Sequence, residues 1–134
     1  MKVTIRTFIE HKGNPRGPGH AKAKLIYIDH KGTRHEREVT AAVENDTKNA
    51  LSLMVVTAAL KMLTKPCEVD LFLDNGYIIY CIKNGWLEDW KNRGWKRVTG
   101  KDPANVILWK NLYIALGLHK IRFKEEKNGR IKNY

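Results

Sequence analysis

Apolar and polar residues alternate at the start of the chain. Between residues 2 and 9, Val3 and Ile5 are separated by polar residues, which is the two-residue period of a half-buried strand, although Phe8 falls on its polar face. Glycines and prolines crowd residues 11–19, where they disfavour both a helix and a central strand. We therefore expect a first strand followed by a loop.

Four more strands are expected from similar patterns. Residues 21–28 and 34–42 flank the turn-forming sequence Asp29-His30-Lys31-Gly32 and predict a hairpin. Residues 68–73 combine β-branched and aromatic side chains and predict a fourth strand. A fifth strand is expected at residues 120–126, followed by a short polar tail to the end of the chain.

The spacing of apolar residues becomes helical between residues 46 and 63. Leu51 and Val55 belong to one apolar stripe, and neighbouring apolar residues widen it. So wide a face indicates a helix that packs centrally on a sheet. Asp46 or Thr47 is expected to cap the start of this helix, because a short polar side chain accepts a hydrogen bond from the first free amides.

Shorter helices are expected after the fourth strand. Residues 77–83 form the first, and Trp86 and Trp90, four residues apart, lie on one side of the next. The pair Asp102-Pro103 is a favourable start for the last helix, and Gly117 is expected to end it.

This order of elements indicates an α/β fold in which three antiparallel strands and then parallel strands form a mixed five-stranded sheet flanked by helices.

With 134 residues, 43% of them hydrophobic, residues 1–134 are expected to form a single domain. No segment approaches the roughly 20 apolar residues of a membrane span, and no secretory pattern opens the chain. Cys67 and Cys81 lack a ligand pattern and predict free thiols. We therefore expect a cytoplasmic protein with no membrane partner.

Positive charge is in large excess. Lysine and arginine outnumber aspartate and glutamate by 25 to 14, which gives a formal net charge of +11. This balance is typical of proteins that bind polyanions. A well-solvated surface without a particular partner is the alternative, and the placement of the cations has to decide between the two.

The cations and three tryptophans gather in residues 85–96. Cations neutralise phosphates and release counterions, and indoles lie along sugars and bases, so this segment is a candidate grip on a nucleic-acid duplex. Packing against the core is the alternative role for at least two of the indoles. The candidate binding residues here are Trp86, Trp90, Lys91, Arg93, Trp95 and Lys96.

The same segment resembles the basic protrusion of bacterial-type ribonuclease HI. The resemblance covers nearly the whole chain and identifies it as a homologue of that family. Its motifs are Trp-x3-Trp-Lys-x-Arg-Gly-Trp-Lys from Trp86, Asn105-Val106-x-Leu108-Trp109, Ala115-Leu116-Gly117, Gly13-Asn14-Pro15, Thr47-x-Asn49, Pro66-Cys67-Glu68-Val69, Asp74 and Tyr77.

The resemblance implies a ribonuclease H-like fold and a known chemistry. The family cuts the RNA strand of RNA/DNA hybrids with two Mg²⁺ ions held by four carboxylates, the oxygen ligands that this hard ion prefers. Here Phe8 and Ser52 occupy the first two carboxylate positions, and only Asp74 is retained as a catalytic and metal-binding candidate. Residues 128–134 lack the family's histidine loop and last aspartate, so we expect a C-terminally truncated homologue without the terminal helix.

The resemblance also implies contacts to the minor groove of a hybrid through Asn14, Thr47 and Asn49. Turn and helix-cap chemistry is the alternative role for these three residues. Gly76 departs from the family, which carries a polar residue two positions beyond the retained aspartate.

Three hypotheses follow. The first is an inactive ribonuclease H homologue, a pseudoenzyme that binds RNA/DNA hybrid or another duplex and needs no cofactor. The second is an active Mg²⁺-dependent nuclease whose site is completed by Glu10 or by a partner, such as a second copy in a homodimer. The third is a protein-protein interaction module.

Overall fold

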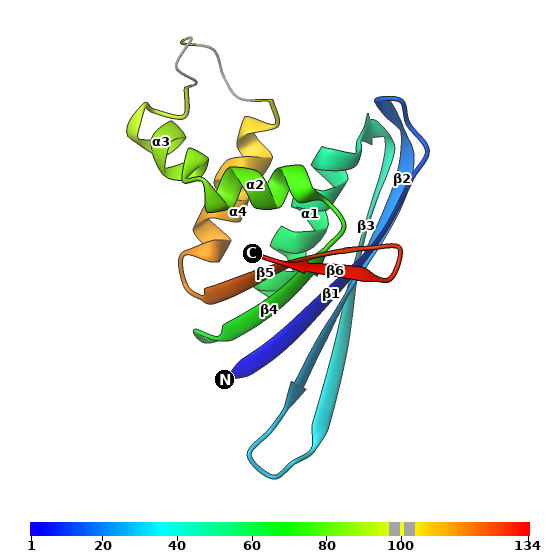
Figure 1. Ribbon diagram of the computed structural model, residues 1–134, viewed down its shortest axis with the longest axis vertical. Helices are drawn as coiled ribbons and strands as arrows, with labels where there is room; N and C mark the ends of the chain where they lie inside the picture. The colour runs from blue at the N-terminus through cyan, green and yellow to red at the C-terminus, as the bar shows by residue number, and fades with distance from the viewer. Residues whose placement is uncertain (97–99, 101–103) are drawn as a thin grey trace.

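The computed structural model describes residues 1–96, 100 and 104–134, which form a six-stranded sheet and four helices. In chain order the elements are β1 (Lys2–His11), β2 (Arg16–Ile28), β3 (Arg34–Thr47), α1 (Lys48–Lys61), β4 (Glu68–Leu73), α2 (Gly76–Lys83), α3 (Trp86–Asn92), α4 (Val106–Leu116), β5 (Lys120–Lys127) and β6 (Arg130–Asn133) (Figure 1). The α/β class predicted from the sequence is confirmed.

The sheet has the strand order β3-β2-β1-β4-β5-β6. Strands β1, β2 and β3 are antiparallel, β4 and β5 run parallel to β1, and β6 returns antiparallel to β5. Ile5 lies at the centre, opposite Leu25 on one side and Leu71 on the other. Because parallel strands end at the same edge of a sheet, the segments that follow β1, β4 and β5 meet at one edge, which we call the carboxyl edge.

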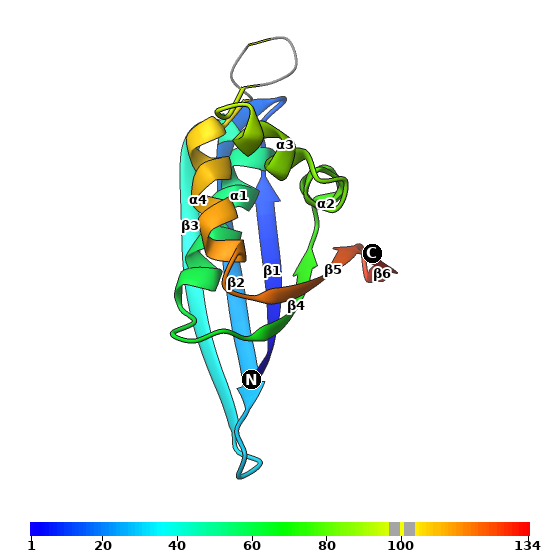
Figure 2. The same ribbon diagram turned by 90° about the vertical axis from the view of Figure 1, so that its left-hand side faces the viewer.

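Helix α1 forms the centre of the core. Leu51 and Val55 lie on one side of the helix and Leu53 lies on another, and all three are fully buried. The helix packs on β1, β2 and β3 and is covered by α4 (Figure 2). The wide apolar face expected from the sequence is therefore enclosed between the sheet and a second helix.

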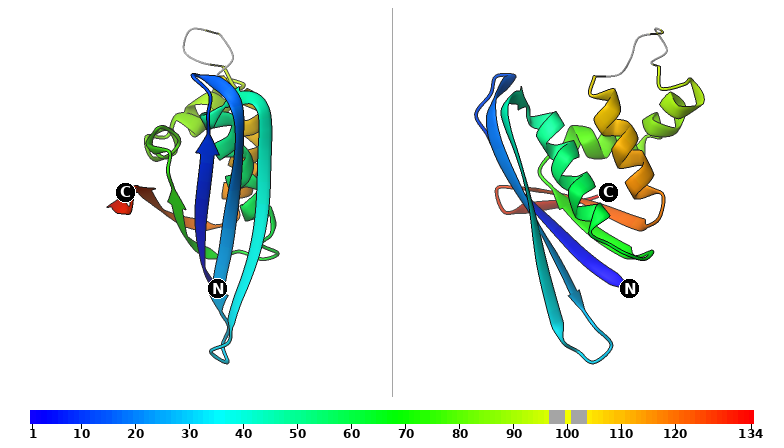
Figure 3. Two further views of the ribbon diagram at one scale, coloured as in Figure 1. Left: turned by 90° about the vertical axis from the view of Figure 1, so that its right-hand side faces the viewer. Right: turned by 180° about the vertical axis from the view of Figure 1, so that it is seen from behind.

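The two faces of the sheet differ. Val3, Ile5 and Thr7 of β1 are buried under the helices, whereas the alternate residues Arg6 and Phe8 lie on the opposite face. In the described ranges, no helix covers that opposite face, which we call the open face. Figure 3 shows β1, β2 and β3 lying in front of the helices in its left-hand view.

The segment expected to be a loop is largely strand. Strand β2 begins at Arg16, and its register against β3 shifts between Gly17 and Gly19. A Cβ atom at Gly19 would lie 2.9 Å from a methyl group of Leu51, and one at Gly17 would lie 2.7 Å from the Cα atom of Gly13. The glycines therefore let the strand pass close to its neighbours, a use that the sequence pattern did not reveal.

The polar tail expected at the end of the chain forms β6, so the sheet has six strands and the prediction of five was wrong. Asn128 and Gly129 both have positive φ angles, 51° and 77°, and join Lys127 directly to Arg130. Asn-Gly is the preferred pair for a two-residue hairpin turn, because both residues tolerate positive φ. The signal for this strand was therefore present in the sequence.

The start of α1 and the end of α4 can be compared with the capping residues predicted from the sequence. The Thr47 hydroxyl accepts a hydrogen bond from the Ala50 amide at 3.1 Å, so Thr47 is the cap of α1, one of the two predicted choices. Gly117 ends α4 as expected. The predicted start at Asp102-Pro103 lies outside the described residues.

Cys67 and Cys81 are buried free thiols, as expected. Of the helices that the structure describes, none has the length and hydrophobicity needed to cross a membrane.

The connection between α4 and β5 generates a pH-dependent prediction. His119 Nδ1 accepts a hydrogen bond from the Cys67 amide at 3.1 Å, and burial lowers the pKa of His119 below its ordinary value of 6.5. The folded state therefore favours the neutral ring, and this stabilisation is complete above pH 6.5 and is lost as the pH falls. We expect His119→Gln to flatten the loss of stability between pH 7.5 and pH 5, measured by urea denaturation.

The matched control is His30→Gln, which changes an exposed histidine in the β2–β3 turn. This control should retain the pH dependence of the wild type. An unchanged pH dependence in His119→Gln would contradict the assignment.

Candidate nucleic-acid interface

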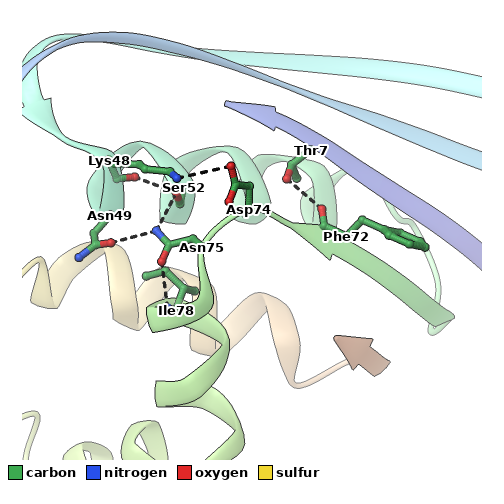
Figure 4. Close-up of polar contacts among 8 residues, drawn as sticks. All are labelled: Thr7, Lys48, Asn49, Ser52, Phe72, Asp74, Asn75 and Ile78. Carbon is green, nitrogen blue, oxygen red and sulfur yellow. Dashed lines mark hydrogen bonds and ion pairs between the residues drawn. The ribbon is translucent and has the colours of Figure 1, made fainter. Parts of the chain in front are cut away.

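The retained carboxylate lies at the carboxyl edge, where β4 ends. Asp74 and Asn75 follow the last residue of this strand and precede α2. The first turns of α1 lie beside them, and Figure 4 shows Lys48, Asn49 and Ser52 of that helix pointing toward this junction. The site is therefore built from the end of a strand and the starts of two helices.

Asn75 joins these elements through its amide group. Its Nδ2 atom donates to Asn49 Oδ1 at 2.9 Å and to Ser52 Oγ at 3.1 Å, and its Oδ1 atom accepts from the Ile78 amide at 3.2 Å. The side chain is buried, so each of its polar atoms has a partner within the protein. The amide thus caps α2 and fixes it against α1 (Figure 4).

Ser52 takes the position that the family resemblance assigns to a glutamate. Its side chain is fully buried, and its hydroxyl donates to the Lys48 carbonyl at 2.8 Å while accepting from Asn75. The hydroxyl is therefore paired both as a donor and as an acceptor. A carboxylate there would need a positive partner, because burying an unpaired charge is costly.

Asp74 is paired with a cation from the same chain. The Lys48 ammonium lies 3.6 Å from the Asp74 carboxylate, and the two side chains are 41% and 34% exposed. An ammonium group therefore lies beside the one carboxylate that the family resemblance assigns to metal binding.

Phe8 does not fill the site, although the family resemblance assigns it to a carboxylate position. Its ring is 47% exposed on the open face of the sheet, and the Lys24 ammonium lies 5.9 Å from the ring centroid. The residue before it, Thr7, faces the helices and donates to the Phe72 carbonyl at 2.9 Å (Figure 4). Phe8 adds apolar surface next to the site instead of occupying it.

The residues do not fit a two-metal centre. Glu10, the candidate replacement ligand, is 76% exposed and lies 3.4 Å from His20 on the open face. Within the described part of the chain, no group of three or more histidine, cysteine, aspartate or glutamate side chains is arranged to hold a metal ion. Two Mg²⁺ ions need several oxygen ligands and a net negative charge around them. Asp74 is a single carboxylate, and the ammonium of Lys48 beside it offsets its charge.

The predicted minor-groove residues lie at the same carboxyl edge. Asn14 is exposed in the loop between β1 and β2, and strand pairing places Arg16 opposite Thr47 at the start of α1. Thr47 is engaged as a helix cap, and Asn49 is held by Asn75. Of these three side chains, only that of Asn14 makes no hydrogen bond to another described residue.

We call residues 86–96 the α3 element. Trp90 is only 9% exposed and meets Trp109 edge-to-face at 5.5 Å between ring centroids. Trp86 contacts Tyr80 and Trp95 contacts Tyr113 in similar edge-to-face geometry. Trp90 therefore anchors the element to α4 and is not available for direct contact, which corrects its prediction as a binding residue.

The end of the α3 element has a fixed backbone. The Trp95 amide donates to the Trp90 carbonyl, and the Gly94 amide donates to the Lys91 carbonyl. This pair of bonds, with positive φ at Gly94, is the Schellman motif that ends many helices. The motif places Trp95 against Tyr113 and leaves its neighbours at the surface.

The three cations of the element are exposed. They are Lys91, Arg93 and Lys96. Lys91 lies 5.3 Å from the ring centroid of Tyr113, and the pKa of its ammonium is raised by the Tyr113 hydroxyl and, to a lesser degree, by Glu88. Lys91 is therefore positively charged at neutral pH.

Comparison with known proteins places the chain in a family. The RNase H family model matches residues 11–126. The ribonuclease H of Lachnoclostridium phytofermentans is 41% identical over 123 residues, which are 92% of this chain and 78% of that protein. The ribonuclease H of Acetivibrio thermocellus is 39% identical over 126 residues, covering 94% of this chain and 82% of that protein. The chain therefore belongs to the ribonuclease H family.

A solved structure supports the fold. LC9-RNase H1, described as a type 1 RNase H with the type 2 active-site motif, has a TM-score of 0.79 and 25% sequence identity to this chain. The match covers 95% of this chain and 63% of that one. The ribonuclease H-like fold inferred from the resemblance is confirmed.

Two residues at the site were missed by the sequence analysis. Lys48 and Asn75 carry no motif of their own, because their roles depend on the approach of α1 to the end of β4. The placement of Asn75 before a helix did carry a weak signal, since asparagine is a favoured cap.

The Asn75 network generates a stability prediction. Asn75→Ala removes the α2 cap and leaves Asn49 and Ser52 without their shared donor, so we expect a loss of about 1–3 kcal/mol in the free energy of unfolding. Urea denaturation measures it. The control Asn111→Ala, at an exposed position of α4, should change stability by less than about 0.5 kcal/mol. Equal effects of the two substitutions would contradict a stabilising network.

Proposed function

We propose that this protein is a non-catalytic member of the ribonuclease H family that binds RNA/DNA hybrid or another nucleic-acid duplex. The observation that carries the proposal is the ion pair between Asp74 and Lys48, at 3.6 Å. It places a positive charge beside the one carboxylate that the family resemblance retains at the site.

The loss of catalysis follows from charge. Two Mg²⁺ ions bring four positive charges to the scissile phosphate and are held by carboxylates that balance them. Here the corresponding positions are a neutral, buried Ser52 and an apolar Phe8, and the ammonium of Lys48 adds repulsion toward any cation near Asp74. The site therefore lacks the net negative charge that two metal ions require.

The capacity to bind a duplex does not need those carboxylates. Affinity for nucleic acid comes mostly from cations that neutralise phosphates and release counterions. The α3 element offers Lys91, Arg93 and Lys96 at the surface, held in place by indoles packed below them. The exposed Asn14 supplies a polar contact at the carboxyl edge, and half-exposed Trp86 and Trp95 add flat apolar edges.

The proposal predicts binding without cleavage. Incubated with a labelled RNA/DNA hybrid and Mg²⁺, and separately with Mn²⁺, the wild type should retain the hybrid in a gel-shift assay and release no product. Asp74→Asn is the control, because a contaminating nuclease would act equally in both preparations. Metal-dependent product that disappears in Asp74→Asn would overturn the proposal and indicate an active site completed in another way.

The second prediction concerns the α3 element. Combined Lys91→Gln, Arg93→Gln and Lys96→Gln substitutions should weaken duplex binding for all sequences alike. The slope of log affinity against log salt should fall in magnitude by about 0.9 for each phosphate contact removed, which is about 2–3 for the three. Fluorescence anisotropy at several salt concentrations measures both quantities.

The matched control removes the same charge elsewhere, by Lys31→Gln, Arg37→Gln and Lys65→Gln. These cations are exposed, and Lys31 marks the β2–β3 turn at the end of the molecule opposite α3 (Figure 1). The control should keep a salt slope close to that of the wild type. Equal losses in the two triple variants would mean that net charge, and not the α3 element, determines binding.

A further inference from the structure

The β5–β6 hairpin carries a cluster of cations that the family resemblance did not anticipate. Lys127 lies directly opposite Arg130 across the hairpin, and Lys132 lies opposite Glu125. Directly opposed residues share one face of a sheet, so these four side chains project to the same side. They line a cavity of about 480 Å³ together with Asn128.

That side faces the proposed site. Phe123 is buried under the helices, and Glu125 and Lys127 follow it at two-residue intervals on the same face of β5. The Glu125 carboxylate reaches the start of α2, where a Cβ atom added at Gly76 would lie 2.8 Å from it. The hairpin therefore lies beside the residues that follow Asp74 (Figure 1).

The positive charges of the hairpin are only partly balanced within the described residues. Lys127 and Arg130 have no acidic partner there, and Lys132 contacts the ring of Tyr134 at 5.0 Å from the centroid. Of the two carboxylates in β5, Glu125 projects to the same side as the cations, opposite Lys132, and Glu126 projects to the other side. Glu126 is paired with Arg6 at 2.8 Å on the opposite face, and Glu125 accepts a hydrogen bond from the Tyr134 hydroxyl at 3.1 Å.

This arrangement is unfavourable without an anion. Like charges directly opposite each other destabilise a strand pair, and the Asn128-Gly129 turn holds Lys127 and Arg130 in that register. An anion between them would convert the repulsion into attraction. A phosphodiester backbone offers such charges at closely spaced positions.

We propose that Lys127, Arg130 and Lys132 form a second phosphate-binding element, which grips the backbone of the same duplex that contacts the α3 element. This inference rests on the proposed function. Helix α2 connects the two elements, since its first residue approaches Glu125 and α3 follows its last turn. Its eight residues span about 12 Å, so the two elements lie near the two ends of one short helix.

The test compares three variants of the full chain that each lose three positive charges. The hairpin variant combines Lys127→Gln, Arg130→Gln and Lys132→Gln, and the two others are the α3 and the distant-charge variants described above. Each is titrated with the same 24-base-pair RNA/DNA hybrid by fluorescence anisotropy at several salt concentrations. Thermal melting without nucleic acid is the second measurement.

We expect the hairpin variant to lose about tenfold or more in affinity at moderate salt and about 2–3 units of salt slope, while the distant-charge variant stays near the wild type. Without nucleic acid, the hairpin variant should melt close to the temperature of the wild type, because relief of the repulsion between Lys127 and Arg130 offsets the lost attraction between Lys132 and Glu125. This second result separates a lost phosphate contact from a lost fold.

Two outcomes would overturn the inference in distinguishable ways. If the wild type binds the hybrid and the α3 variant loses affinity while the hairpin variant does not, the hairpin is not a phosphate-binding element and the proposed function stands. If the wild type binds no duplex even at low salt, the proposed function fails, and the inference fails with it.

Discussion

The burial of helix α1 is the constraint on which the rest of the structure depends. Its side chains are buried in several directions, against three strands and against α4. A helix enclosed in this way cannot rotate or slide without opening the core, because protein interiors are close-packed. Its first turn is therefore held beside the end of β4, and the positions of Lys48, Asn49 and Ser52 follow from packing that occurs further along the helix.

Much of this fold could be predicted from the chain because hydrophobic periodicity reports burial directly. Residues 68–73 and the apolar face of α1 were identified on that basis. The start of β2 was not, because glycines that usually mark a loop here allow a strand to approach Leu51. Strand β6 was missed because it is exposed and polar, so that only its Asn-Gly turn distinguished it from a tail.

The candidate site shows where prediction from sequence ends. The family resemblance assigns Phe8 and Ser52 to two carboxylate positions, and this is visible along the chain, but the roles of their neighbours are not. Lys48 and Asn75 are 27 residues apart in the sequence. They come close together only when α1 packs on the sheet, where Lys48 pairs with Asp74 and Asn75 donates to Ser52. The exposed ring of Phe8 likewise depends on the alternation of β1, which turns it to the open face while Thr7 faces the helices.

The pairing of Asp74 with Lys48 also bears on whether the stability of the fold depends on metal ions in solution. Clustered carboxylates repel one another when no cation is bound, so the stability of a protein that carries them rises with the concentration of the ion. In this chain the compensating charge is covalently part of the molecule. For a protein with the proposed function, the stability of the carboxyl edge is therefore expected not to depend on the concentration of divalent cations.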